Sequence, residues 1–367
     1  MEQMGVKPQR NGLIDIMRLI FAGIVMMYHF YSDRKHFPAG RFGVEFFVIL
    51  AGFLMFAAYE HSRTAGLSAE DHRSIWLNYV KRRYIRFFWY SLIAFAVAFF
   101  VVRIWLGQLS GAANICNKLS GDIWEVFLVK MFGINRGKSL LNVPAWTLGC
   151  MLFSEFVILG ALTFWRRPFL SFWMPISIIF GTGYWINLES TNHAGFLQFF
   201  TFGMLRVYLL TCFGVVSYLI YIRLRRITFS QVGGGILTVL ELLGYMLCIA
   251  ITCYKDTRHY QFCFILIAVL TLAASFSRKS FAGSRLPANN LTNFCAEFSL
   301  SLYLIHWPVL KAFRHFYPEL NDLYRQKFVF LFCSLAAALA YTYVMRGVFK
   351  MLPTVKQKIK SIVLEQT

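Results

Sequence analysis

Long apolar runs separated by polar connections organise the whole chain. A helix needs about 20 largely apolar residues to cross the hydrocarbon core of a bilayer, and ten segments approach that length. They lie near residues 13–31, 42–60, 87–106, 146–164, 169–187, 206–222, 236–253, 259–276, 292–313 and 327–349. The pattern predicts an all-α fold, a polytopic membrane helix bundle with about ten transmembrane helices.

Basic residues predict the orientation of this bundle. Lys and Arg collect in the connections that share the side of the N-terminus, most densely at residues 81–86, 166–167 and 223–226. Such residues favour the cytoplasmic side, so we expect both termini in the cytoplasm. No repeat or shift in composition divides the chain, and we expect one transmembrane domain over 1–355 followed by a short cytoplasmic tail over 356–367.

The composition agrees with a membrane protein. Of the 367 residues, 58% are hydrophobic and only 15% are charged, which excludes an ordinary soluble domain. In a soluble chain the net charge of +20 would favour nucleic acid as a partner, but here the basic residues flank apolar segments. Anionic membrane lipids are therefore the expected partners, and nucleic acid is not. The eight cysteines show no paired spacing, so we expect neither a disulfide framework nor a metal site.

The first apolar segment carries three ionisable residues on one stripe. A helix turns 100° per residue, so Asp15, Arg18 and His29 fall within about 60° of one another, with Ala22 between them. Ionisable groups in a membrane span are costly unless they face the interior of the bundle, which makes them functional candidates. The alternative is structural: Asp15 and Arg18 form an ion pair that locks the helix, and His29 lies at the membrane interface.

Glu45 begins the second segment at a depth comparable to that of His29. A carboxylate beside an imidazole can hold its tautomer, raise its basicity and stabilise the imidazolium. We therefore consider Glu45 as an orienting partner of His29. The alternative, a solvated glutamate at a helix start, is compatible with the same spacing.

Six stretches occur in an order that resembles the acyltransferase 3 family of integral-membrane acyltransferases. They are "IDIMRLIFAGIVMMYH" (14–29), "GVEFFVILAGFLM" (43–55), "RRYIRFF" (82–88), "PAWTL" (144–148), "RVYLLTCFG" (206–214) and "SLSLYLIHWPVL" (299–310). Each stretch is weakly specific alone, whereas the ordered set spans almost the whole chain. Two departures occur: Ala51 stands where the family usually has serine, and the proline common after the R-x-x-R element is absent.

The resemblance implies a membrane O-acyltransferase of the bacterial cytoplasmic (inner) membrane. Its donor would be cytoplasmic acyl-CoA, most simply acetyl-CoA, and its acceptor a hydroxyl of a surface or lipid-linked carbohydrate. His29 is then the expected catalytic residue, as general base or as acyl carrier, with Glu45 as its partner. We expect the thioester to reach His29 along the stripe of Asp15, Arg18 and Ala22, where the first two residues form a polar entrance for the donor.

The resemblance also implies a site for the phosphates of the donor. Arg82, Arg83 and Arg86 begin the third span from the inside, and residues three and four apart on a helix share a face. The three guanidinium groups can clasp phosphates through charge-assisted hydrogen bonds. The alternative is an ordinary positive-inside anchor.

Four further residues are candidates for binding the substrate. Ser299, Tyr303 and His306 fall within about 60° of one another on the ninth span, where they can bind the donor carbonyl or the acceptor sugar. The alternative is polar contact between helices. Trp146 can stack on a sugar, or it can belong to the interfacial aromatic belt.

Two other classes of function fit the same composition. A transporter or flippase for a glycan or a small anionic substrate also needs many spans and a polar pathway. The chain lacks the paired halves and the matching Gly/Pro-broken helices of many transporters. A structural or sensory membrane protein would use its charges only to hold helices together.

Overall fold

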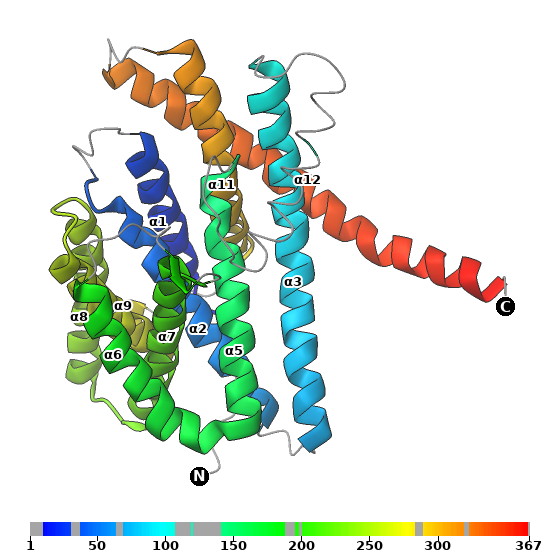
Figure 1. Cartoon of the computed structure of the whole chain (residues 1–367). Coiled ribbons are helices and arrows are strands. Elements are labelled where there is room, and N and C mark those ends of the chain that lie inside the picture. Colours follow the sequence, from blue (N-terminus) through cyan, green and yellow to red (C-terminus); the bar gives the residue numbers. More distant parts are fainter. Residues whose placement is uncertain are drawn as a thin grey trace.

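A computed structural model describes residues 10–30, 37–63, 69–106, 119, 141–187, 195–197, 200–282, 289–318 and 323–365 (Figure 1). Its ten long helices are α1 (Gly12–Phe30), α2 (Gly43–Arg63), α3 (Ala69–Phe99), α5 (Trp146–Pro168), α6 (Met174–Asn187), α7 (Phe202–Arg226), α8 (Gln231–Thr252), α9 (Arg258–Ser277), α11 (Asn290–Phe316) and α12 (Leu323–Glu365). Short 3₁₀ turns precede α2 and α5, at Gly40–Phe42 and Val143–Ala145, and π-helical turns follow α3 and α5, at Phe100–Trp105 and Phe169–Trp173. A small antiparallel hairpin, β1 (Gly195–Leu197) with β2 (Phe200–Thr201), precedes α7.

The helical membrane bundle predicted from the sequence is confirmed. Within the described ranges, eight helical stretches are long and apolar enough to cross a membrane. One of them, Val143–Asn187, is 45 residues long and contains the fourth and fifth predicted spans. Its backbone leaves the helical conformation at Trp165 (φ −137°, ψ 43°). The chain bends there, and α5 and α6 meet at an angle at the lower end of Figure 1. The ninth predicted span is α11, which has 27 residues but is more polar than the eight.

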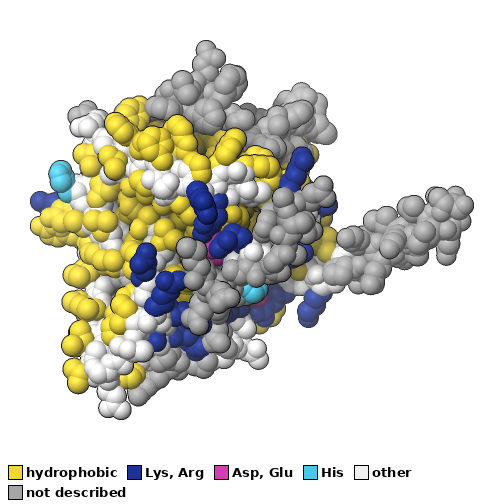
Figure 2. Space-filling view, turned by 90° about the horizontal axis from the view of Figure 1, so that it is seen from below, with side chains coloured by type: hydrophobic (Ala, Val, Ile, Leu, Met, Phe, Trp, Pro, Cys, Tyr) yellow, Lys and Arg dark blue, Asp and Glu magenta, His cyan; other side chains and the backbone are white. Residues whose placement is uncertain are grey.

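The exterior of the bundle is apolar. Phe180, Val232 and Phe332 are each more than 70% exposed, and many other large hydrophobic side chains are exposed with them. Figure 2 shows this surface from below, with hydrophobic side chains over much of the rim and Lys and Arg gathered nearer the middle. An apolar outside surface is favourable only against lipid, because in water it would form a far larger exposed patch than monomeric proteins tolerate.

Two glycines bring α2 and α7 into direct backbone contact. A Cβ atom built on Gly52 would overlap the backbone of Thr211, and one built on Gly214 would overlap the backbone of Ile49. Small residues at a membrane helix interface permit this approach, which increases van der Waals contact where lipid offers no hydrophobic driving force. The backbones of α2 and α7 therefore lie closer together than they could with larger residues at Gly52 and Gly214.

The cytoplasmic placement of the termini and the domain boundary near residue 355 remain predictions. Helix α12 continues through that boundary to Glu365. The long connection predicted between the third and fourth spans lies mostly outside the described residues.

Candidate active site

A narrow crevice of about 180 Å³ lies between α1, α2, α3, α5 and α11. Along α2 its lining runs from Val44 to Leu54, a helical rise of about 15 Å. The complete lining is Arg18, Val44, Phe47, Leu50, Ala51, Leu54, Arg83, Arg86, Phe87, Thr147, Leu148, Met151, Ser299, Leu300 and Tyr303. Sites for small molecules usually enclose about 300–1,000 Å³, so this crevice fits a slender chain and not a whole nucleotide.

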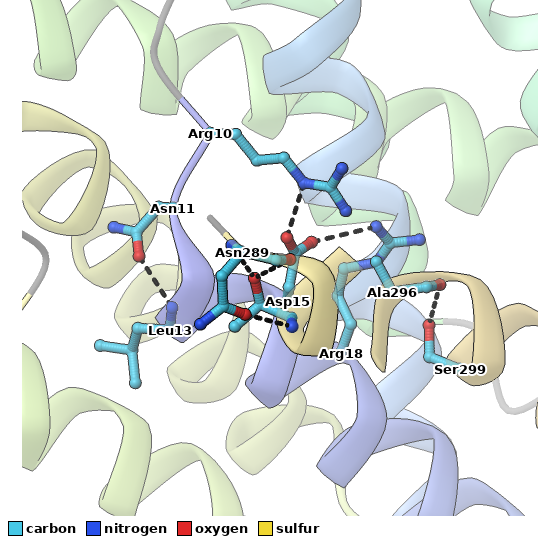
Figure 3. A network of polar contacts seen from close by, with 9 residues as sticks. Arg10, Asn11, Leu13, Asp15, Arg18, Asn289, Ala296 and Ser299 are labelled. Atoms are coloured by element: carbon cyan, nitrogen blue, oxygen red, sulfur yellow. Dashed lines mark hydrogen bonds and ion pairs between the residues drawn. The ribbon is translucent and has the colours of Figure 1, made fainter. Parts of the chain in front are cut away.

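Three arginines stand at one end of the crevice, and Arg18 is the one that α1 contributes. The Arg18 guanidinium pairs with the Asp15 carboxylate at 3.5 Å, and Arg10 Nε donates a hydrogen bond of 2.8 Å to Asp15 Oδ2 (Figure 3). Asp15 is only 5% exposed. The i,i+3 ion pair of the structural alternative is therefore present, and Arg18 also lines the crevice.

The other two arginines of this end belong to α3. Arg83 pairs with Glu155 of α5, a carboxylate that is 2% exposed. Arg86 lines the crevice and also lines a second, wider cavity of about 960 Å³ between α3, α11 and α12. Arg82 lines only the wider cavity and not the crevice. The three arginines that the sequence grouped together thus divide between two adjoining spaces, with Arg86 at their junction.

The wider cavity has several basic side chains in its lining. Besides Arg82 and Arg86, its lining includes Arg346 and Lys350 of α12. Arg346 Nε donates a hydrogen bond of 2.7 Å to Glu297 Oε2, which leaves an excess of positive charge along the walls. Arg346 and Lys350 could not be predicted as binding residues from the sequence, because α12 carries no local motif that points to a ligand.

The opposite end of the crevice is closed by hydrogen bonds between α5 and α11. The Tyr303 hydroxyl lies 2.8 Å from Thr147 Oγ1 and donates to the Pro144 carbonyl at 3.0 Å. Ser299 lines the crevice, but its hydroxyl donates to the Ala296 carbonyl of its own helix at 2.8 Å. Tyr303 thus forms a wall of the crevice that two hydrogen bonds hold in place, whereas Ser299 offers only its oxygen lone pairs to the space.

Two histidines lie just beyond this wall. The ring centroids of His29 and His306 are 5.2 Å apart, and those of His29 and Trp307 are 5.3 Å apart. His306 is fully buried, and its ring lies 6.3 Å from that of Tyr303. His29 is half-buried and faces α11, so it is turned toward the protein and not toward lipid. It does not line the crevice: Tyr303 does, the His306 ring contacts Tyr303, and the His29 ring contacts His306.

The hydrogen bonds of His306 define its tautomer. Nδ1 lies 3.0 Å from the Leu302 carbonyl, which only accepts, so Nδ1 carries the proton of the neutral ring. Nε2 is then a bare acceptor, and within the described part of the chain it has no hydrogen-bond partner. An unpaired acceptor buried in a membrane protein costs free energy, and such atoms commonly meet a ligand or water. His306 therefore presents an unused lone pair next to His29.

The route expected along α1 is wrong at Ala22. That residue is fully buried in an apolar cluster with Met26 of its own helix and with Phe298 and Leu302 of α11. Close packing between α1 and α11 leaves no space along the stripe, and the crevice runs instead along α2, α3 and α5, with Arg18 as the shared residue.

The pairing of Glu45 with His29 is also not found. Glu45 is fully buried, and its Oε1 accepts hydrogen bonds from Arg206 of α7 and Gln261 of α9. Arg206 is 3% exposed. A fully buried carboxylate needs a full positive charge beside it, which Arg206 supplies and a neutral imidazole does not. The sequence left the acidic partner of Arg206 unidentified, because residues 161 positions apart carry no local signal of contact.

Trp146 lies half-buried at the start of α5, packed against the main apolar core. It is the neighbour of Thr147, which touches the Tyr303 wall, but Trp146 itself does not line the crevice. Neither the sugar-stacking nor the belt interpretation is tested by this position.

A family model described as an acyltransferase domain matches residues 11–347, nearly the whole chain. No curated protein and no solved structure gives a significant match.

Proposed function

Since the chain belongs to the acyltransferase domain family, as the match over residues 11–347 shows, we propose that it is a membrane O-acyltransferase that uses acyl-CoA. The acyl group, most simply acetyl, passes from a cytoplasmic donor to a hydroxyl of a surface or lipid-linked carbohydrate. The host membrane is the bacterial cytoplasmic membrane. Family membership gives the acyltransferase class alone, and the donor, the acceptor and the catalytic histidine are parts of the proposal.

The single observation that carries the proposal is the shape and charge of the crevice. It is too small for a nucleotide, it begins at three arginines and it extends about 15 Å along α2 toward the histidines. A donor made of a thin thioester arm and a phosphorylated nucleotide matches this division. Its phosphates stay at the guanidinium groups, where charge-assisted hydrogen bonds hold them, while the arm enters the apolar space.

The wider cavity offers room for the nucleotide end. At about 960 Å³ it is large enough for a drug-sized ligand, and Arg82, Arg86, Arg346 and Lys350 give it positive walls. Because Arg86 lines both spaces, a donor whose nucleotide lies in the wider cavity can direct its arm straight into the crevice.

The transfer itself belongs to the histidine pair in this account. As a general base, His29 takes the proton of the acceptor hydroxyl while the oxygen attacks the thioester carbon, and the proton then leaves with the CoA thiolate. As a nucleophile, His29 attacks the thioester carbon, the carbon–sulfur bond breaks, and CoA leaves as the thiol with the ring proton. The acceptor oxygen then attacks the acyl carbon, the bond from that carbon to the imidazole nitrogen breaks, and the hydroxyl proton returns to the ring. In either route Nε2 of His306 accepts a hydrogen bond, from the hydroxyl or from His29. Tyr303 must swing aside for the arm to reach the pair.

The test is thioester cleavage by the purified full-length protein in detergent. Acetyl-CoA labelled in the acetyl group is supplied with a glycan fraction from cells that lack the protein, and free CoA and labelled glycan are measured. The proposal expects both products, and it expects His29→Ala to lose them at least a hundredfold. His315→Ala is the matched control, because His315 is exposed at the end of α11. Loss of activity in the control, or full activity in His29→Ala, would overturn the assignment.

The transporter alternative predicts another outcome of the same experiment. A transporter or flippase moves its substrate across vesicles and leaves the thioester intact. Intact acetyl-CoA after prolonged incubation with protein that is folded and monodisperse would favour that alternative over the enzyme.

A further inference from the structure

A basic hollow of about 780 Å³ lies on the bundle, and none of its lining residues lines the crevice. Its lining residues come from the last turns of three helices: α2 ends at Arg63, α5 at Pro168 and α7 at Arg226. Its charged lining consists of five arginines: Arg63, Arg166, Arg167, Arg223 and Arg226. Basic side chains of this kind gather on the lower face of the molecule (Figure 2).

One carboxylate offsets part of this charge. Glu60 is 1% exposed, and it pairs with Arg166 at 2.9 Å and with Arg63 at 3.3 Å. These two arginines therefore tie the ends of α2 and α5 together. In the portion of the chain that the structure describes, Arg167, Arg223 and Arg226 have no ion-pair partner.

The helix ends themselves offset a further part. Each C-terminal end carries roughly half a negative charge from its unsatisfied carbonyl groups, so the ends of α2 and α7 contribute about one negative charge, whereas α5 continues through Phe169–Trp173 into α6. Five guanidinium groups against Glu60 and these dipoles leave a surplus of about three positive charges. Positive-inside residues at helix ends are expected, but this surplus in one hollow exceeds what the helix ends neutralise.

The surroundings place the hollow beside lipid. Leu219 and Ile222 of α7 form its apolar wall. Four aromatic residues around the bend from α5 into α6 are each more than half exposed: Phe164, Trp165, Phe172 and Trp173. Exposed aromatic side chains cluster at the headgroup level of membrane proteins, so Arg166 and Arg167 lie at that depth.

We propose that this hollow binds the phosphodiester headgroup of an anionic phospholipid. A lipid with two phosphates, cardiolipin, matches this surplus better than a lipid with one, and its chains would run along the apolar wall. Bound there, the lipid holds the C-terminal ends of α2 and α5 together. Other parts of these two helices, Val44–Leu54 and Thr147–Met151, line the crevice. The inference does not depend on the proposed enzymatic activity.

The test compares lipids on the full-length protein in a neutral detergent. Bound lipid is counted by native mass spectrometry, and the melting temperature is followed with added cardiolipin, phosphatidylcholine or inorganic phosphate. We expect cardiolipin to raise the melting temperature and to remain bound, whereas the other two additions do neither. Each arginine near a membrane surface contributes about 1 kcal/mol to attraction, so the triple variant Arg167→Gln, Arg223→Gln, Arg226→Gln should bind cardiolipin on the order of a hundredfold more weakly.

The matched control removes the same charge from exposed positions outside the hollow. It combines Arg73→Gln, Lys81→Gln and Arg225→Gln, and it should keep the wild-type affinity. Equal losses in both triple variants would reduce the effect to general charge and overturn the site. An equal stabilisation by inorganic phosphate would show a soluble anion site and overturn the lipid assignment. Failure of the wild-type protein to bind cardiolipin would overturn both the site and the lipid assignment.

Discussion

Replacing Glu45 by glutamine separates a structural role of this residue from a catalytic one. In the structure the carboxylate is fully buried and neutralises Arg206, which is itself only 3% exposed. Glutamine keeps the shape and can still accept from Gln261, but it removes the buried negative charge with which the Arg206 guanidinium pairs. Breaking a buried ion pair by removing one partner costs about 3–5 kcal/mol, because the other charge stays buried.

That cost corresponds to a rise of about a hundred- to several-thousand-fold in the equilibrium constant for unfolding. It is measured by reversible unfolding of the purified protein in mixed micelles with increasing denaturing detergent. A double variant, Glu45→Leu with Arg206→Met, removes both charges and should recover most of the lost stability, since an apolar pair of similar volume is often neutral or better.

Activity gives the second readout for the same variants. If Glu45 is structural, the folded fraction of the double variant should keep its rate of thioester cleavage and its pH profile. Unchanged stability in Glu45→Gln, together with a lost rate or a shifted pH profile, would contradict this reasoning and restore Glu45 as the partner of His29.

Three further substitutions test the crevice and its ends. Ala51→Leu fills space beside the thioester arm, so KM for acetyl-CoA should rise about tenfold; Leu54→Ala widens the same crevice and should spare KM. Tyr303→Phe removes the hydroxyl that holds the wall to Thr147 and Pro144, so acceptor-independent loss of acetyl-CoA should rise severalfold, and an unchanged rate would argue against a movable wall. Glu155→Gln removes the buried carboxylate that pairs with Arg83, so the free energy of unfolding should fall by about 3–5 kcal/mol. A loss under about 1 kcal/mol, which is typical of an exposed ion pair, would contradict this expectation.

The apolar pattern was sufficient to predict the bundle because each membrane helix satisfies its own backbone and must present an apolar length fixed by the bilayer. All ten predicted segments are helical in the structure. The bend at Trp165 does not follow from the apolar pattern, although Pro168, three residues later, is a local signal for it, because proline cannot donate a backbone hydrogen bond to the Phe164 carbonyl. The predicted spans 146–164 and 169–187 nevertheless stop and start within a few residues of it.

Contacts between helices were the part that periodicity could not supply. The Asp15–Arg18 pair was predictable, since both residues lie on one helix at i,i+3. The partners of Glu45 and Arg83 lie on other helices, and only the packing of α2 on α7 and of α3 on α5 brings them together. Packing of α1 on α11 likewise buries Ala22, and the crevice lies instead along α2, α3 and α5.

The most direct test of the central claim uses sealed vesicles that contain the reconstituted protein. Acetyl-CoA labelled in both the acetyl and the CoA parts is added outside, and the glycan fraction is enclosed inside. The account predicts that the acetyl label appears on the enclosed glycan while the CoA label stays outside. Acetyl label that enters the vesicles still joined to CoA would contradict transfer through the crevice.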